Sequence, residues 1–156
     1  MARDLQRLVR DIQFFVSGQP GTGFRGFGRA SIFFSDDGQY LYLPSVTLPE
    51  VFRQLTTPVL IVVPDGYGYG VPLTDVYVDA ELRTHQGRRP SRLYQGRNGR
   101  LPAGLTSAER LVRLARLVHY PGVIPRLAYL CVHSRDDVSL WEYLEQIQIY
   151  LSRPVG

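Results

Sequence analysis

The sequence contains no lysine, and all 18 of its basic residues are arginine. The first explanation is codon usage in a GC-rich genome. A functional explanation is that an enzyme handling activated acyl groups gains by offering them no amine of its own. Arginine does not compete for such groups, because its guanidinium stays protonated and is a poor nucleophile. The absence of lysine is therefore compatible with acyl-transfer chemistry but does not demonstrate it.

Cysteine is almost absent as well, since Cys131 is the only one. A single cysteine excludes an internal disulfide framework, and such a chain is more easily placed in a reducing compartment. No apolar run approaches the roughly 20 residues that cross a bilayer. The charged start, residues 1–7, is not followed by the apolar core of a signal peptide. We expect a cytoplasmic protein with no membrane partner.

What is present fits one ordinary globular domain over residues 1–156, with 44% hydrophobic and 21% charged residues. The net charge of +4 is modest and scattered along the chain. The arginine-rich stretch 84–104 has little aromatic interleaving beyond Tyr94, so we rank a nucleic-acid-binding protein last among the functions considered. No motif calls for a metal or a cofactor, and we expect neither.

Apolar residues at helical spacing predict an amphipathic helix over residues 2–16. Its charged residues, Asp11 among them, are expected largely on the opposite face. The predicted buried positions are Leu5, Leu8, Val9, Ile12 and Phe15 or Val16. The glycine-rich stretch 18–28 lacks the Gly-Lys-Ser/Thr ending of a phosphate-binding loop and is interpreted as a connector.

Four strands are predicted next. Residues 30–34 and 39–43 flank an Asp-Gly turn, which is a strong hairpin signal. Two more strands cover residues 58–63 and 75–79, and between them the Gly-, Pro- and Tyr-rich stretch 64–72 predicts an ordered turn. Residues 84–104 are expected to form a long polar loop.

The second half begins with a capping box, Thr106 to Glu109, which predicts a helix over 106–118. A short apolar strand ends at Cys131. A second capping box, Ser139 to Glu142, opens a last helix that reaches about Ser152. The order of elements predicts an α+β fold, with an antiparallel sheet of four strands covered by helices.

Cys131 lies where a strand gives way to a polar loop ahead of a helix. On local sequence alone the commoner interpretation is a small buried apolar residue. The alternative is a reactive thiol, since a nearby cation or helix N-terminus raises the thiolate fraction. His133 would point to the same side as Cys131 if the strand continued. It could then acidify the thiol or act as a base, and a plain surface histidine is an equal alternative.

Several motifs, in order, resemble the ubiquitin-conjugating (UBC-like) family. Residues 64–72 resemble its Pro-x-x-Tyr-Pro turn between two strands. His119-Tyr120-Pro121-Gly122, followed by an apolar run to Cys131, resembles its His-Pro-Asn and Cys-Leu arrangement. Residues 140–154 resemble the helix after the catalytic cysteine. The piece around 75–82 is closer to divergent prokaryotic members than to eukaryotic ones.

The resemblance implies a UBC-like fold with an N-terminal helix, a four-stranded antiparallel meander and a C-terminal helix after the cysteine. It also implies that Cys131 is the thioester-forming nucleophile. The sequence departs from the family at Gly122, which stands where the oxyanion-supporting asparagine belongs. Backbone N–H groups near Cys131, or the His133 side chain, could replace that amide.

Asp136 and Asp137 are both candidate general bases for the incoming nucleophile, and one of them could instead cap the last helix. Capping is favoured for Asp137, and Asp136 is left open between the two roles. His119 is expected to fix the turn at Pro121, with His85 as a second match to the family histidine. Trp141 and Tyr143 are expected to pack into the core or against the loop.

The activity implied is acyl transfer. An adenylating, activating enzyme would supply a ubiquitin-like protein, or a target protein's C-terminus, and Cys131 would pass it to an acceptor. Some prokaryotic relatives belong to antiphage nucleotide-signalling operons in which a nucleotidyltransferase is modified, so the resemblance extends to that setting. The alternative function is a non-catalytic UBC-like module that binds proteins through the same fold.

Overall fold

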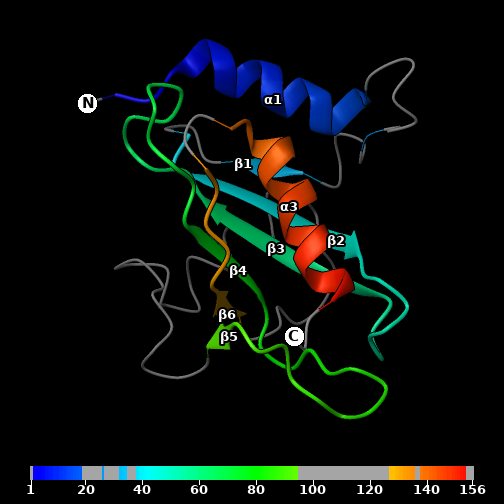
Figure 1. Cartoon of the computed structure of the whole chain (residues 1–156). Coiled ribbons are helices and arrows are strands. Elements are labelled where there is room, and N and C mark those ends of the chain that lie inside the picture. Colours follow the sequence, from blue (N-terminus) through cyan, green and yellow to red (C-terminus); the bar gives the residue numbers. More distant parts are fainter. Residues whose placement is uncertain are drawn as a thin grey trace.

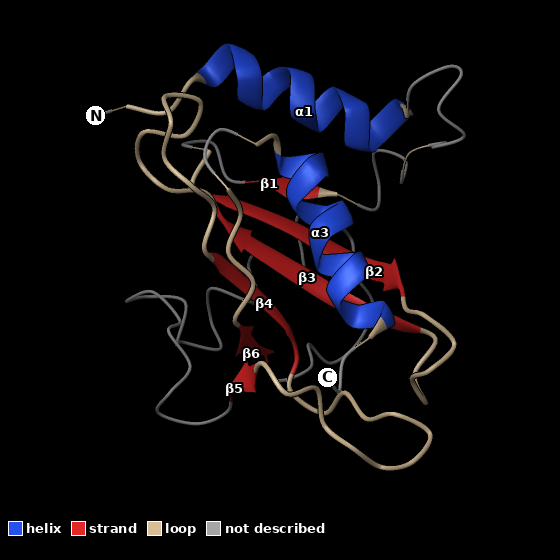
Figure 2. Ribbon diagram, in the orientation of Figure 1, coloured by secondary structure: helices blue, strands red, loops and turns tan. Residues whose placement is uncertain are grey.

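The computed structural model describes residues 2–18, 26, 32–34, 38–94, 127–135 and 138–153. Within these residues two helices pack against one antiparallel sheet of six strands (Figures 1 and 2). The helices are α1 (Leu5–Ser17) and α3 (Leu140–Ser152). The protein is therefore α+β, as the sequence predicts. Neither described helix is long and apolar enough to cross a membrane.

The sheet has the strand order β1-β2-β3-β4-β6-β5. The strands are β1 (Phe33–Phe34), β2 (Tyr40–Thr47), β3 (Thr56–Val62), β4 (Asp75–Asp79), β5 (Leu93–Tyr94) and β6 (Leu127–Leu130). The four predicted strands correspond to β1 to β4, and the Cys131 strand, β6, joins the sheet beside β4. Part of the stretch expected to be a polar loop was predicted wrongly, because Leu93–Tyr94 pair with β6.

Alternation along the strands divides the core into two faces of the sheet. Leu41, Ile61 and Val76 lie on the face that the helices cover, together with Leu8 and Phe15 of α1 and the buried side of α3 (Figure 1). The opposite face is rich in tyrosine. Its buried residues are Tyr40, Tyr42, Leu60, Val62, Tyr77, Leu127 and Tyr129, and Cys131 packs against them.

Helix α1 begins at the N-cap Asp4, whose carboxylate accepts a hydrogen bond from the Arg7 backbone N–H. The buried side carries Leu8, Asp11, Ile12 and Phe15. The predicted face was wrong at three positions: Leu5 is 62% exposed, Val9 is 52% exposed, and Asp11 is only 5% exposed. The described buried face is thus narrower than the sequence suggested, and it includes a carboxylate.

Helix α3 confirms the predicted capping box. Ser139 is the N-cap, its hydroxyl accepts from the Glu142 backbone N–H, and the Glu142 carboxylate accepts from the Ser139 N–H. Tyr143 is fully buried, as expected, while Trp141 is half-buried and stacks on Phe14 of α1 with ring centroids 4.9 Å apart.

The turn between β3 and β4 packs against the start of α1. The Asp4 backbone N–H donates to the Tyr67 carbonyl at 2.8 Å. Gly68 has a φ of +89°, and a Cβ placed there would lie 2.5 Å from the Asp4 Cβ. A larger residue at position 68 would be both strained and obstructed. The predicted ordered turn is therefore a packed one.

Several predictions fall outside the described residues. These are the hairpin turn at 35–37, the helix over 106–118, the roles of His119, Asp136 and Asp137, the departure at Gly122, and most of the glycine-rich stretch 18–28.

Candidate functional site

Cys131 follows directly after β6, at the predicted junction between strand and loop. Its side chain is half-buried and packs against the tyrosine-rich face. Its backbone N–H donates to the Arg92 carbonyl at 2.9 Å, which extends the pairing between β6 and β5 by one residue. The thiol is thus fixed through its backbone while its sulfur remains partly accessible.

His133 approaches the sulfur from two residues further along the chain. Its Nε2 lies 3.8 Å from Cys131 Sγ and 3.1 Å from the hydroxyl of Tyr129. The Tyr129 hydroxyl also donates to the Thr74 carbonyl at 3.2 Å. Tyr129 is 3% exposed, whereas His133 is exposed. His133 thus lies on the same side as Cys131, although the strand that was expected to bring this about ends at Leu130 and the Val132 N–H donates to the Leu130 carbonyl at 2.9 Å.

Backbone and side-chain hydrogen bonds fasten the loop that carries these residues. Ser134 and Leu73 bond reciprocally: the Ser134 N–H donates to the Leu73 carbonyl, and the Leu73 N–H donates to Ser134 Oγ, both at 2.7 Å. From α3, Gln146 donates to the His133 carbonyl at 2.8 Å and Tyr143 donates to the Val132 carbonyl. The sheet and α3 therefore hold the residues that follow Cys131.

Tyr143 is a neutral neighbour of this loop. Burial raises the pKa of its hydroxyl, and the nearby Tyr129, Asp75 and Cys131 act in the same direction. Because the hydroxyl keeps its proton, it remains a donor to the Val132 carbonyl across the physiological range of pH. Tyr143 thereby contributes a fixed anchor and no charge.

A second polar cluster joins α1, the turn after β3 and the N-terminus of α3. The Asp11 carboxylate accepts hydrogen bonds from the Tyr67 hydroxyl and, at 3.3 Å, from the Leu140 backbone N–H. The same N–H lies 3.0 Å from the Tyr67 oxygen. Burial raises the pKa of Asp11, although Tyr67, Leu140 and the nearby arginines oppose this effect. Burial, followed by the bond to Asp11, also raises the pKa of Tyr67.

Sequence reasoning missed this cluster. One signal was available, because Asp11 comes three residues after Leu8 and four before Phe15, which places it on the buried stripe of α1. The Tyr67 partner lies 56 residues away along the chain. No local pattern relates the two.

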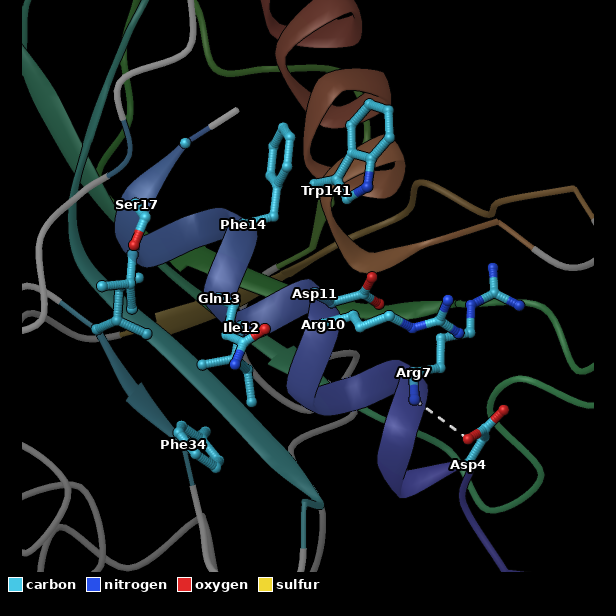
Figure 3. Close-up of a pocket in the computed structure, with 13 residues that line it drawn as sticks. Asp4, Arg7, Arg10, Asp11, Ile12, Gln13, Phe14, Ser17, Phe34 and Trp141 are labelled. Carbon is cyan, nitrogen blue, oxygen red and sulfur yellow. Dashed lines mark hydrogen bonds between the residues drawn. The ribbon is translucent and has the colours of Figure 1, made fainter. Parts of the chain in front are cut away.

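A pocket runs along α1 toward α3 (Figure 3). Asp4, Arg7 and Arg10 line one part of it, and the stacked rings of Phe14 and Trp141 line another. Cys131 is not among its lining residues. The pocket borders the Asp11 cluster and is separate from the thiol.

The remaining histidine of the described chain, His85, lies in an exposed turn, where its backbone N–H donates to the Val51 carbonyl. The contacts around Cys131 come from His133, Tyr129 and Arg92. In the part of the chain that the structure describes, no group of three or more His, Cys, Asp or Glu side chains is arranged to hold a metal ion.

Comparison with models of protein families, with curated protein sequences and with solved structures gave no match to this chain. The site's function is therefore argued from its own geometry and from the sequence resemblance.

Proposed function

We propose that this chain is a divergent ubiquitin-conjugating-like enzyme that carries a ubiquitin-like protein, or the C-terminus of a target protein, as a thioester on Cys131. The observation that carries the proposal is the half-buried Cys131 thiol with the His133 imidazole nitrogen 3.8 Å from its sulfur. A nucleophilic cysteine needs a reachable sulfur and a nearby group that favours its thiolate.

The surroundings of the thiol support the proposal. A thioester must be held in place while two macromolecules dock, and the Ser134–Leu73 pair and the donors from α3 fasten the loop for that task. The turn that resembles the family's Tyr-Pro segment is joined to this loop directly, because Leu73 follows it. The finer UBC-like topology, with a four-stranded meander ahead of the cysteine, is part of the same proposal.

The reaction has two steps. In the first, Cys131 loses its proton to solvent, and the thiolate attacks the carbonyl carbon of an acyl adenylate supplied by the activating enzyme. A C–S bond forms and the C–O bond to AMP breaks, so that AMP leaves with the electron pair. In the second, an acceptor amine attacks the thioester, a C–N bond forms, the thiolate leaves and the amine's proton passes to solvent or to a base.

The test is an intact-mass measurement. The purified chain is mixed with ATP, the activating enzyme and the ubiquitin-like protein encoded beside it, after adenylation by that enzyme has been verified by pyrophosphate exchange. We expect an adduct equal to the ubiquitin-like protein minus water, which thiol reductants remove. Cys131→Ser should give a reductant-resistant oxyester or no adduct, and Cys131→Ala should give none.

If no adduct forms while adenylation proceeds, the proposal fails and the non-catalytic binding module becomes the better account. An adduct that persists in Cys131→Ala would also contradict it, because the carrier would then be another residue. Whether the setting is antiphage defence, with a nucleotidyltransferase as the modified protein, depends on which acceptor the loaded chain serves.

A further inference from the structure

Three polar atoms around Cys131 form a chain that limits where their hydrogens can lie. Tyr129 has one hydroxyl proton, and its oxygen contacts both the Thr74 carbonyl at 3.2 Å and His133 Nε2 at 3.1 Å. A carbonyl oxygen can only accept a hydrogen bond, whereas an imidazole nitrogen can donate or accept. The roles of the two contacts follow from this difference.

One arrangement satisfies both of these contacts. If Tyr129 donates to the Thr74 carbonyl, its oxygen has lone pairs left and accepts a hydrogen bond from His133 Nε2–H. If Tyr129 instead donates to His133, the Thr74 carbonyl loses its bond to the buried Tyr129 hydroxyl. That arrangement costs more free energy, because an acceptor beside a buried side chain is left without this donor. Hydrogen positions of this kind are assigned from the network of partners.

We infer that Tyr129 is a positioning residue that holds His133 with a proton on Nε2, so that His133 donates toward Cys131 Sγ and does not accept the thiol proton at that nitrogen. The Nε2–H lies between two acceptors, the Tyr129 oxygen and the Cys131 sulfur. In neutral His133 the lone pair is then on Nδ1.

The inference rests on the proposed function for its consequence in catalysis. A donor beside the sulfur stabilises the thiolate, which is both the nucleophile of the first step and the leaving group of the second. His133 thus assists through a hydrogen bond, and proton removal from the acceptor amine falls to solvent or to another group. This choice separates the two roles that the sequence left open for His133.

Among the described residues, the titratable and charged groups around the cluster are Tyr143, Asp75, Arg135 and Arg92, whose carbonyl accepts from the Cys131 N–H and whose guanidinium lies over the Tyr150 ring. Tyr143, from α3, keeps its proton because burial raises its pKa. Asp75, from β4, is the carboxylate close enough to influence Tyr143, and its Oδ1 accepts from the Thr74 hydroxyl. Arg135, exposed and two residues past His133, is the described cation nearest in the chain. Among the described residues, the Cys131 sulfur is hydrogen-bonded to His133 Nε2 and to no charged side chain.

The first test reads the protons directly. In ¹⁵N-labelled protein at a pH where His133 is neutral, long-range ¹⁵N–¹H correlations distinguish the two imidazole tautomers. The chain has three histidines, and His133→Gln identifies the signal that disappears. We expect the Nε2–H tautomer for His133 in the wild type and a mixture of tautomers in Tyr129→Phe. An Nδ1–H tautomer in the wild type would overturn the inference.

The second test separates a donor from a base. Because Cys131 is the only cysteine, its alkylation by iodoacetamide in the folded protein is followed without interference. A glutamine amide can donate where His Nε2 does, but it cannot act as a base. We expect His133→Ala to lower the alkylation rate at neutral pH by roughly fivefold, while His133→Gln retains at least about half of the wild-type rate.

Equal losses in His133→Ala and His133→Gln would favour a base at Nε2 and overturn the inference. Neither test depends on thioester formation. If His133 is the Nε2–H tautomer and no thioester forms, the proposed function fails while the inference stands. If a thioester forms and His133 is the Nδ1–H tautomer, the inference fails alone.

Discussion

Two polar clusters in this molecule are each built on a tyrosine hydroxyl, and they differ in what surrounds them. Asp11 and Tyr67 lie in the core where α1, the turn after β3 and α3 meet, with exposures of 5% and 1%. Tyr129, at the other cluster, is equally buried, but its partner His133 is exposed and Cys131 is half-buried. The first cluster is buried, although Asp11 also lines the pocket beside α1, while the second, the open cluster, includes an exposed histidine and a half-buried thiol.

We therefore expect the first cluster to stabilise the fold and the second to set the reactivity of the Cys131 sulfur. In the buried cluster Asp11 Oδ2 accepts from the Tyr67 hydroxyl and the Leu140 N–H, so removal of this carboxylate takes an acceptor from buried donors and weakens the fold. In the open cluster water can replace a lost partner, so its removal spares the fold and changes the reactivity of the sulfur. Substitutions in the two clusters should therefore differ in their effect on the free energy of unfolding.

Asp11→Ala removes the acceptor of the Tyr67 hydroxyl and one of the two acceptors of the Leu140 N–H, which keeps its 3.0 Å bond to the Tyr67 oxygen. We expect the free energy of unfolding to fall by about 3 kcal/mol, because a buried hydroxyl loses its acceptor and the Leu140 N–H loses one of its two. Urea denaturation followed by circular dichroism measures the change. Tyr67→Phe should give a smaller loss of about 1–2 kcal/mol, since it removes one hydroxyl and leaves the ring.

The pair of changes also reports their coupling. In the double variant, Asp11→Ala with Tyr67→Phe, the loss should be smaller than the sum of the single losses because the two residues share one hydrogen bond. Additive losses would mean that the two residues do not interact. A loss below about 0.5 kcal/mol in Asp11→Ala would be typical of a surface site, and either result would contradict a buried, coupled pair.

The pH dependence of the free energy of unfolding tests the burial of Asp11 in a second way. Burial raises the pKa of Asp11 above its ordinary value of 3.8, so the folded state binds its proton more tightly than the unfolded state does. The stabilisation linked to that proton is fully present below pH 3.8 and is lost as the pH rises through the higher folded value.

As the pH rises above about 4, the free energy of unfolding of the wild type should therefore fall relative to that of Asp11→Asn. Between the unfolded and the folded pKa of Asp11, the fall should be up to about 1.4 kcal/mol per pH unit. Urea denaturation of both proteins at several pH values measures the difference. Glu145→Gln, which changes an exposed carboxylate of α3, is the matched control and should show no comparable slope. If the wild type instead becomes more stable relative to Asp11→Asn as the pH rises, the pKa of Asp11 is not raised by folding.

The smallest effect is expected at the open cluster. His133→Ala should change the free energy of unfolding by less than about 0.5 kcal/mol, because the side chain is exposed and water can replace it. The measurement is again urea denaturation, run beside the alkylation assay. A loss near that of Asp11→Ala would mean that the two clusters do not differ in kind.

The sequence predicted the parts of this structure that depend on local spacing. The capping box of Ser139 and Glu142 set the start of α3, β4 matches its predicted residues, and Cys131 follows its strand as expected. His133 lies beside Cys131, as a continued strand would place it, although β6 ends at Leu130 and the Val132 N–H turns back to the Leu130 carbonyl.

What was missed depends on contacts between distant segments. Thr74, whose carbonyl fixes the Tyr129 hydroxyl, is 55 residues from it along the chain. Strand β5 has only two residues in a polar stretch, and its pairing with β6 is what makes it a strand. Sequence periodicity describes one element at a time, so the partners that complete both tyrosine clusters were outside its reach.

We expect the Cys131 thiol of the folded protein to be a reactive group. Its alkylation rate at neutral pH in native buffer, compared with the rate in urea-unfolded protein, tests this claim most directly. We predict that the folded protein reacts at least as fast as the unfolded one, because the loop presents the sulfur beside the His133 donor. A folded protein that reacts roughly a hundredfold more slowly would show a thiol protected by the fold, and would contradict the account.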